Sequence, residues 1–222
     1  MYKHFAKRLI DIVLSGIAIV LLAIPMLIIA IAIKIDDPGP VLFKQKRVGK
    51  KKNGEITYFM IWKFRSMKMS TPHDTPTHLL ENPEQYITRV GRFIRKTSLD
   101  ELPQIYQVFT SKLSIVGPRP ALWSQDDLVA EREKYGANDV KPGITGWAQI
   151  NGRDELEIDV KAKFDGEYAK ALKSGWFRGF WMDVKCFFGT FISVLKSDGV
   201  VEGGTGEMKR KTETSKDDIK IG

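Results

Sequence analysis

The chain has 222 residues, 43% of them hydrophobic, which is enough for one ordinary domain with attachments. Its single cysteine, Cys186, excludes an intrachain disulfide and fits a reducing, cytosol-facing compartment. The formal net charge of +8 indicates an anionic partner: nucleic acid, a phosphorylated ligand or an acidic lipid surface.

An uncharged apolar stretch runs from Ile12 to Ile33 near the start of the chain. As a helix its 22 residues are about 33 Å long, and the hydrocarbon core of a bilayer is about 30 Å thick. The stretch is too long for the core of a signal peptide, and no small-residue cleavage site follows it. We expect a membrane-inserted helix, with a buried helix of a soluble domain as the alternative.

Both flanks of this stretch are basic. Three cations precede it: Lys3, Lys7 and Arg8. Between residues 34 and 52, seven cations stand against two aspartates, a balance of +5. The positive-inside rule then places both ends in the cytoplasm, and Pro25 predicts a kink. A re-entrant hairpin bent near Pro25 satisfies both flanks, and a spanning helix that tolerates the proline is the alternative.

A β-hairpin is predicted after the apolar stretch, because Asn53-Gly54 is a strong turn signal. Alternate positions of its second strand are apolar: Ile56, Tyr58, Met60 and Trp62. Three cations lie near the exit of that strand: Lys63, Arg65 and Lys68. They suit an anionic ligand, and a solvated strand edge is the plainer reading.

Residues 70 to 85 are polar, hold three prolines and read as a surface loop, and the spacing of His73 and His78 does not suggest a metal site. A helical pattern returns from Ile87. Its expected apolar face consists of Val90, Phe93 and Ile94. Cations surround that face: Arg89, Arg92, Arg95 and Lys96.

The segment "TSLDELPQ" places two adjacent carboxylates, Asp100 and Glu101, behind these cations. Ser98 and Glu101 match a capping box, and Pro103 fits a first turn, so a helix should begin within a residue or two of Ser98. Acidic residues in a first turn complement the helix dipole and need no chemistry. A catalytic or metal-binding pair is the other reading.

Two later loops are candidates for binding. Arg119 lies between two prolines, and a stiffly held guanidinium suits bidentate phosphate recognition, although a stiff turn explains the pattern too. Residues 141–153 are glycine-rich, which indicates either close backbone approach or plain turns. Neither a GxxxxGK[ST] nor a GxGxxG motif is present, so nucleotide binding of those two types is not supported.

The C-terminal part is aromatic and then polar. Seven aromatic side chains crowd residues 176–191 of a predicted helix that reaches Leu195, either as core or in the headgroup region of a membrane. Residues 203–222 are predicted to be a disordered tail. A membrane anchor, many cations on loops and paired carboxylates together favour phosphoryl chemistry at a membrane surface, with a lipid as the second substrate.

Six segments occur in order over residues 7 to 153: "KRLIDIVLS", "DPGPVLFKQKRVG", "WKFRSM", "GRFIRKTSLDELPQ", "LSIVGPRP" and "KPGITGWAQINGR". Together they resemble the bacterial sugar transferases, the monotopic phosphoglycosyl transferases. The resemblance implies transfer of a sugar 1-phosphate from a UDP-sugar to undecaprenyl phosphate, with release of UMP. It also implies a required Mg²⁺ and a covalent phosphosugar intermediate.

The resemblance places the nucleophile, and a ligand for Mg²⁺, on Asp100, with Glu101 as its partner in positioning or proton transfer. Candidate substrate-binding residues are Lys63, Arg65, Arg95, Pro118, Arg119, Gln149, Arg153 and Asp165. One departure is Ile24-Pro25, where the family often has Ser-Pro. We expect a shallower bend, because no hydroxyl satisfies the freed carbonyl.

The expected fold is α/β and mostly helical. Residues 1–36 are expected to form the re-entrant helix, and residues 37–202 a cytosolic phosphoglycosyl transferase domain with a short β-hairpin and amphipathic interfacial helices. The expected partners are a UDP-sugar, polyprenyl phosphate and membrane lipids, with no nucleic acid. The expected location is the bacterial cytoplasmic membrane, with the catalytic domain facing the cytoplasm. The alternatives are a metal-dependent lipid-phosphate phosphatase and a non-catalytic membrane scaffold.

Overall fold

The computed structural model describes residues 2–71, 83–152 and 156–195. His73, His78, Arg153 and the tail from residue 203 lie outside these ranges. The α-helices are α1 (Lys7–Asp36), α2 (Arg89–Lys96), α3 (Gln104–Phe109), α4 (Asp126–Lys134), α5 (Trp147–Ile150), α6 (Ile158–Lys173) and α7 (Trp176–Leu195). The strands are β1 (Leu42–Val48), β2 (Tyr58–Phe64), β3 (Ser114–Val116) and β4 (Gly143–Thr145). Short helical turns are η1 (Tyr2–Ala6), η3 (Pro83–Tyr86), η4 (Leu99–Glu101) and η5 (Ala137–Asp139).

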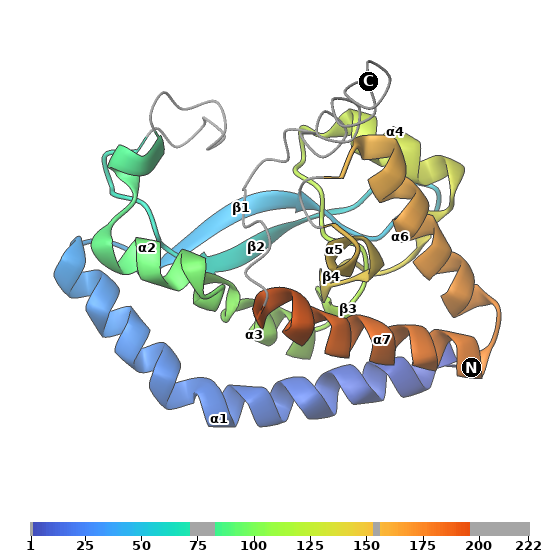
Figure 1. Cartoon of the computed structure of the whole chain (residues 1–222), viewed down its shortest axis with the longest axis horizontal. Helices are drawn as coiled ribbons and strands as arrows, with labels where there is room; N and C mark the ends of the chain where they lie inside the picture. Colours follow the sequence, from blue (N-terminus) through green and yellow to red (C-terminus); the bar gives the residue numbers. More distant parts are fainter. Residues whose placement is uncertain (1, 72–82, 153–155, 196–222) are drawn as a thin grey trace, which may run out of the picture.

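The predicted class, a mostly helical α/β fold with a long apolar N-terminal helix, is confirmed (Figure 1). Helix α1 runs along one side of the molecule as a single bent helix of 30 residues that contains Pro25. The proline ring has no N–H to donate to the carbonyl of Leu21, which favours bending without ending the helix. The molecule therefore has one bent helix and not two helices packed against each other.

The outward face of α1 is apolar and uncovered, and Ile24, for example, is 72% exposed. Among the described residues, α1 is the one helix long and apolar enough to cross a membrane. Its length and composition indicate membrane association. Its inward face carries Met26 and Ile33, which pack with Phe64 of β2 and Ile94 of α2.

The predicted β-hairpin is confirmed. Strands β1 and β2 pair antiparallel, with Leu42 opposite Phe64 and Val48 opposite Tyr58. Asn53 and Gly54 both have positive φ, 50° and 84°, as a tight hairpin turn of this kind requires. Ile61 turns inward against Val108 of α3, whereas Tyr58 and Met60 are exposed.

The predicted helix after Ile87 is also confirmed, and its N-terminus is capped because the Thr88 hydroxyl accepts a hydrogen bond from the N–H of Gly91 at 2.9 Å. Phe93 was expected on the apolar face and is instead 60% exposed, whereas Ile94 is buried. Helix α2 packs on α1 and β2 through Val90 and Ile94, and Phe93 lies outside this contact.

The predicted capping box at Ser98 is wrong. Ser98 has φ 56° and makes no side-chain cap, and α3 begins only at Gln104. The left-handed Ser98 instead closes the end of α2, where its N–H donates to the carbonyl of Arg95 at 3.1 Å. Asp100 and Glu101 consequently lie in the three-residue turn η4 and not in the first turn of an α-helix. The two carboxylates are therefore not explained as first-turn residues that complement the dipole of an α-helix.

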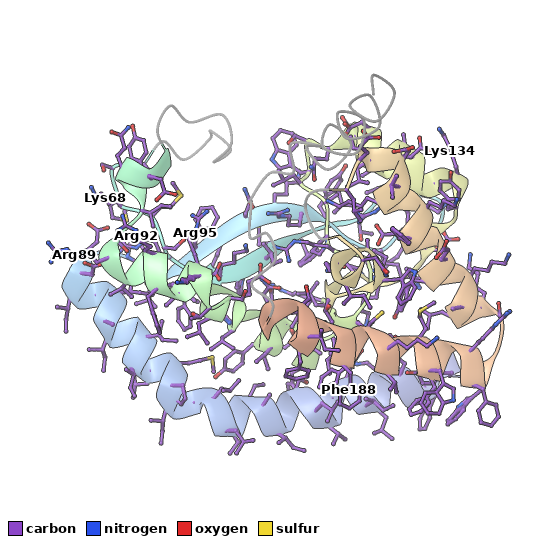
Figure 2. The ribbon with its side chains drawn as sticks, in the orientation of Figure 1. Lys68, Arg89, Arg92, Arg95, Lys134 and Phe188 are labelled. Carbon is purple, nitrogen blue, oxygen red and sulfur yellow. The ribbon has the colours of Figure 1, made fainter. Side chains whose placement is uncertain are left out.

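The second half of the chain builds the other core. Strands β3 and β4 pair in parallel, and α6 and α7 pack beside them (Figure 1). Helix α7 contributes Cys186 and Phe180 to that core and leaves other aromatic side chains uncovered: Phe177, Trp181, Phe188 and Phe191. The helix is thus core on one side and aromatic surface on the other. Figure 2 shows Phe188 on the side of α7 that faces α1.

Candidate active site

The two carboxylates of η4 lie against a lysine from the hairpin. Asp100 is 6% exposed, and its Oδ2 lies 3.8 Å from Nζ of Lys63. The same Nζ is 3.1 Å from Oε1 of Glu101. Lys63 is the penultimate residue of β2, so the hairpin fixes the position of this cation. The sequence prediction that Lys63, Asp100 and Glu101 share a site is consistent with these distances.

Arg119 completes the group from the loop between β3 and α4. Its Nη2 donates to Oε1 of Glu101 at 2.8 Å, and Nη1 donates to Oε2 at 3.4 Å. This end-on pairing uses both Nη atoms of the guanidinium fork and both oxygens of the carboxylate. Glu101 is therefore the residue that joins the hairpin cation to the proline-flanked loop.

Burial by itself would raise the pKa of Glu101, but Arg119 and then Lys63 outweigh burial and hold the pKa of Glu101 well below its usual range. Glu101 is consequently ionised at neutral pH and accepts hydrogen bonds from both cations. A carboxylate in that state positions cations and is a poor proton donor. Of the two roles expected for Glu101, the geometry favours positioning.

The backbone around Arg119 is held from several directions. The Arg119 carbonyl accepts a hydrogen bond from Nη2 of Arg132 at 2.9 Å. The Pro118 carbonyl accepts from the N–H of Gly143 at 3.0 Å. A Cβ atom on Gly143 would lie 2.2 Å from the backbone nitrogen of Gly117, so this glycine allows the two strands to approach. Of the two readings of the glycine-rich segment, close backbone approach applies at Gly143.

Asp165 was expected to contact substrate, but its side chain is fully buried beneath the Arg119 loop. Its Oδ2 accepts hydrogen bonds from Nε and Nη2 of Arg132 at 2.8 and 2.6 Å. Burial raises the pKa of Asp165, and Arg132 opposes that shift. Asp165 is thus linked to Glu101 by three successive contacts, through Arg132 and Arg119.

A profile described as bacterial sugar transferase matches residues 2–197 of the sequence. The chain belongs to the bacterial sugar transferase family. It is 41% identical over 199 residues to the UDP-glucose:undecaprenyl-phosphate glucose-1-phosphate transferase of Escherichia coli K12, an alignment that covers 84% of this chain and 39% of that protein. It is 37% identical over 211 residues to the undecaprenyl-phosphate galactose phosphotransferase of Salmonella typhimurium, which covers 89% of this chain and 42% of that protein.

A third relative, the uncharacterized sugar transferase EpsL of Bacillus subtilis, is 37% identical over 194 residues, covering 87% of this chain and 89% of that protein. The chain spans about two fifths of the length of the E. coli and Salmonella relatives. The alignment with EpsL, by contrast, covers most of both proteins.

Arg65 and Gln149, two other predicted site residues, have partners outside this group, whereas Arg95 lies next to it. Arg65 is buried, and its guanidinium donates to Oδ2 and to the carbonyl oxygen of Asp37, so it ties the exit of β2 to the end of α1. Arg95 lies in the last turn of α2, next to η4. Gln149 lies in α5, where its Nε2 approaches the Ile144 carbonyl at 3.4 Å.

Arg132 was missed by the sequence reading. It stands in the charged stretch "AEREKYG", where one more cation in a helix carries no signal of burial. Only the packing of α4 against α6 shows that Arg132 and Asp165 form a buried ion pair.

Within the described ranges, no group of three or more His, Cys, Asp or Glu side chains is arranged to hold a metal ion. Both oxygens of Glu101 already accept hydrogen bonds from Arg119. Mg²⁺ typically takes one or two carboxylates and completes its shell with substrate phosphate oxygens and water, so Asp100 could hold it only together with such oxygens. The donor set therefore suits a Mg²⁺ that binds together with a diphosphate.

Proposed function

We propose that this chain transfers a sugar 1-phosphate from a UDP-sugar to undecaprenyl phosphate and releases UMP. The observation that carries the proposal is the group formed by Asp100, Glu101, Lys63 and Arg119 in a chain of the bacterial sugar transferase family. The names of the two enzyme relatives differ in the sugar, glucose or galactose, and agree on undecaprenyl phosphate. That agreement supports the acceptor more strongly than any one sugar.

We propose Asp100 as the nucleophile. One of its carboxylate oxygens attacks the sugar-linked phosphorus of the UDP-sugar, an O–P bond forms, and the bond from that phosphorus to the UMP oxygen breaks. An oxygen of polyprenyl phosphate then attacks the same phosphorus. This second attack gives the polyprenyl diphosphate sugar and returns Asp100 to its carboxylate form.

The surrounding charges serve this reaction. A carboxylate and an anionic diphosphate repel each other, and the cations Lys63 and Arg119 reduce that repulsion near Asp100. Glu101 holds both cations through its own charge, so they are in place before the donor arrives. Mg²⁺, bound with Asp100 as its protein ligand, would neutralise charge on the diphosphate and on the departing UMP.

We also propose that α1 is re-entrant, because polar contacts bind both of its ends to one domain. At the start of α1, Nζ of Lys7 donates to Asp183 of α7 at 2.7 Å, and the Asp11 carboxylate accepts the N–H of Ile115 in β3 at 3.0 Å. At its far end, Oδ2 of Asp36 accepts the N–H of Val90 in α2 at 2.8 Å. A spanning helix would have to break one of these two sets of contacts.

The apolar middle of α1 and the exposed aromatic side chains of α7 supply a surface for membrane lipids. With both ends on one side, and basic residues at both flanks, the positive-inside rule assigns that side to the cytoplasm. The proposed location is the bacterial cytoplasmic membrane with the catalytic domain facing the cytoplasm.

The test is UMP release by detergent-solubilised protein with UDP-glucose, UDP-galactose or UDP-N-acetylgalactosamine and polyprenyl phosphate. We expect release to require the lipid phosphate and to vanish in Asp100→Asn, whereas Asp126→Asn, an exposed aspartate of α4, keeps it. A lipid-phosphate phosphatase would release inorganic phosphate from the lipid without any UDP-sugar. A non-catalytic scaffold would show no product and no effect of Asp100→Asn.

A further inference from the structure

Helix α2 carries four cations and no acidic residue in its eight positions. At about 3.6 residues per turn, Arg89, Arg92 and Lys96 fall on one side of the helix. All three are exposed, and Arg95 is half-buried at the margin of that side toward η4. Figure 2 shows Arg89, Arg92 and Arg95 in a row along the side of α2 that faces away from α1, with Lys68 above them.

Backbone hydrogen bonds hold the segment that carries Lys68 next to the start of α2. The N–H of Lys68 donates to the Tyr86 carbonyl at 2.8 Å, just before α2 begins. Two residues earlier, the Ser66 carbonyl accepts the N–H of Thr88 at 3.1 Å. A Cβ atom on Gly91 would lie 1.9 Å from that same Ser66 oxygen, so α2 is seated directly on the chain that leaves β2.

No ion pair joins Lys68, Arg89 or Arg92 to a carboxylate in the part of the chain that the structure describes. Elsewhere on the surface exposed lysines do find such partners, as Lys134 does with Glu131 at 2.5 Å. The three cations, here called the α2 cation row, therefore keep their attraction for an external anion.

The position of α2 indicates which class of anion the α2 cation row binds. Its covered side, with Val90 and Ile94, packs on Met26 and Ile33 of α1, close to the end of the apolar helix. Phe93, 60% exposed, flanks the same side. An amphipathic helix at that level lies where the phosphate groups of lipids are found. A soluble nucleotide is not concentrated at the membrane surface in this way, so the position of α2 favours a lipid phosphate.

The C-terminal end of α2 lies next to the reaction centre. Arg95 is followed within five residues by Asp100, and the N–H of Ser98 bonds to the Arg95 carbonyl at 3.1 Å. Arg92 and Arg89 lie about one and two turns further from Asp100 along the helix. An anion held by Arg89 and Arg92 would thus lie about one to two helical turns from Arg95, which is next to η4 and Asp100.

We propose that Lys68, Arg89 and Arg92 bind the phosphate of the lipid acceptor before it enters the reaction centre. The ligand class is a phosphate monoester on a long isoprenoid chain. This inference rests on the proposed function for the identity of the acceptor, but the binding itself needs no turnover. Bulk anionic phospholipids offer the same phosphate chemistry, and the experiment must separate the two sources.

The test compares the wild type, Arg89→Gln/Arg92→Gln and a matched control, Lys134→Gln/Lys170→Gln, which removes two exposed cations, one from α4 and one from α6. Figure 2 shows Lys134 far from α2. Each protein is placed in nanodiscs of neutral phosphatidylcholine, and binding of undecaprenyl phosphate is titrated without any UDP-sugar. Because each surface cation contributes to anionic-lipid attraction, we expect the α2 variant to bind about tenfold more weakly and the control to bind as the wild type does.

The kinetic arm measures KM for each substrate. The proposal predicts that the KM for undecaprenyl phosphate rises in Arg89→Gln/Arg92→Gln while the KM for the UDP-sugar stays constant. A rise in the UDP-sugar KM alone would place the row on the donor side and overturn the proposal. Equal binding of undecaprenyl phosphate by variant and wild type would overturn it as well.

A third arm separates the lipid sources. Nanodiscs with phosphatidylglycerol test whether the row prefers bulk anionic lipid: if excess phosphatidylglycerol removes the difference between variant and wild type, the row binds lipid phosphates in general and not the acceptor. Failure of the proposed function is distinguishable, because the wild type would then lack UMP release while the binding titration still reports on the row.

Discussion

Nη2 of Arg132 donates a hydrogen bond to the main-chain carbonyl of Arg119 at 2.9 Å. The same guanidinium is paired with Asp165, whose side chain is fully buried. The Arg119 side chain in turn holds Glu101, so the buried pair fixes the loop that delivers a cation to the reaction centre. Arg132 is a positioning residue: it has no contact with the reacting atoms and acts through Arg119.

Replacing Arg132 by Gln should impair both folding and activity. Breaking a buried ion pair costs about 3–5 kcal/mol because an uncompensated charge stays buried. A displacement of the Arg119 loop by about 1 Å is expected to reduce kcat by about a hundredfold. Thermal unfolding in detergent and UMP release measure the two effects.

A double variant separates the two effects. Arg132→Met/Asp165→Leu replaces the pair with apolar side chains, which often restores stability. We expect its melting temperature to recover toward the wild-type value while kcat stays low, because the hydrogen bond from Arg132 to the Arg119 carbonyl is lost. Full recovery of kcat in a stable double variant would show that the pair is only structural.

Glu101→Gln should alter the pH dependence of stability. The pKa of Glu101 is lowered in the folded protein, so its ionised form stabilises the fold above the pKa of the unfolded chain, about 4.3, and this contribution is lost as pH falls toward the folded-state pKa. We expect the variant to be less stable by about 2 kcal/mol at pH 7. The difference should stay constant down to about pH 5 and shrink below about pH 4. A difference that grows on acidification would contradict the assignment.

Cysteine labelling tests the topology of α1. Phe5 is 74% exposed and precedes α1, and the exposed Lys52 follows α1 in the connection between β1 and β2, so Phe5→Cys and Lys52→Cys introduce reactive thiols before and after the helix. The native Cys186 should not react with the maleimide at neutral pH, because burial and then Asp183 raise its pKa to about 12. An impermeant maleimide should label both new thiols in inside-out vesicles only. Labelling from opposite membrane faces would establish a spanning helix.

Divalent-cation removal tests the metal prediction. Because the described residues form no three-ligand group, Mg²⁺ alone should shift the melting temperature very little, whereas Mg²⁺ with UDP should raise it. Chelation should abolish UMP release, and added Mg²⁺ should restore it. Undiminished release in excess chelator would remove Mg²⁺ from the account.

Much of the fold follows from local sequence signals. The uncharged stretch from Ile12 to Ile33 predicts α1, and Asn53-Gly54 predicts the hairpin, because in both cases neighbouring residues alone decide the conformation. The capping box failed for the opposite reason. Ser98 satisfies the local rule, but the end of α2 takes it into the left-handed conformation.

The site was harder to predict than the fold. The sequence motifs indicated Asp100, Glu101 and Arg119, and the structure brings the last two into direct contact. Charge alone could not separate Lys63, which reaches both carboxylates, from Arg65, which is taken up by Asp37. Lys63 and Arg65 would share a face of a regular strand, but β2 ends at Phe64, and the chain that leaves it brings Arg65 to Asp37 at the end of α1.

The central claim is that Asp100 forms a covalent bond to the sugar phosphate. Intact-protein mass spectrometry tests it after the protein is mixed with Mg²⁺ and a panel of UDP-sugars, with no lipid acceptor present. We predict an added mass equal to one sugar phosphate on the wild type, its absence from Asp100→Asn, and its loss from the wild type when polyprenyl phosphate is added. The same added mass on Asp100→Asn would contradict the account.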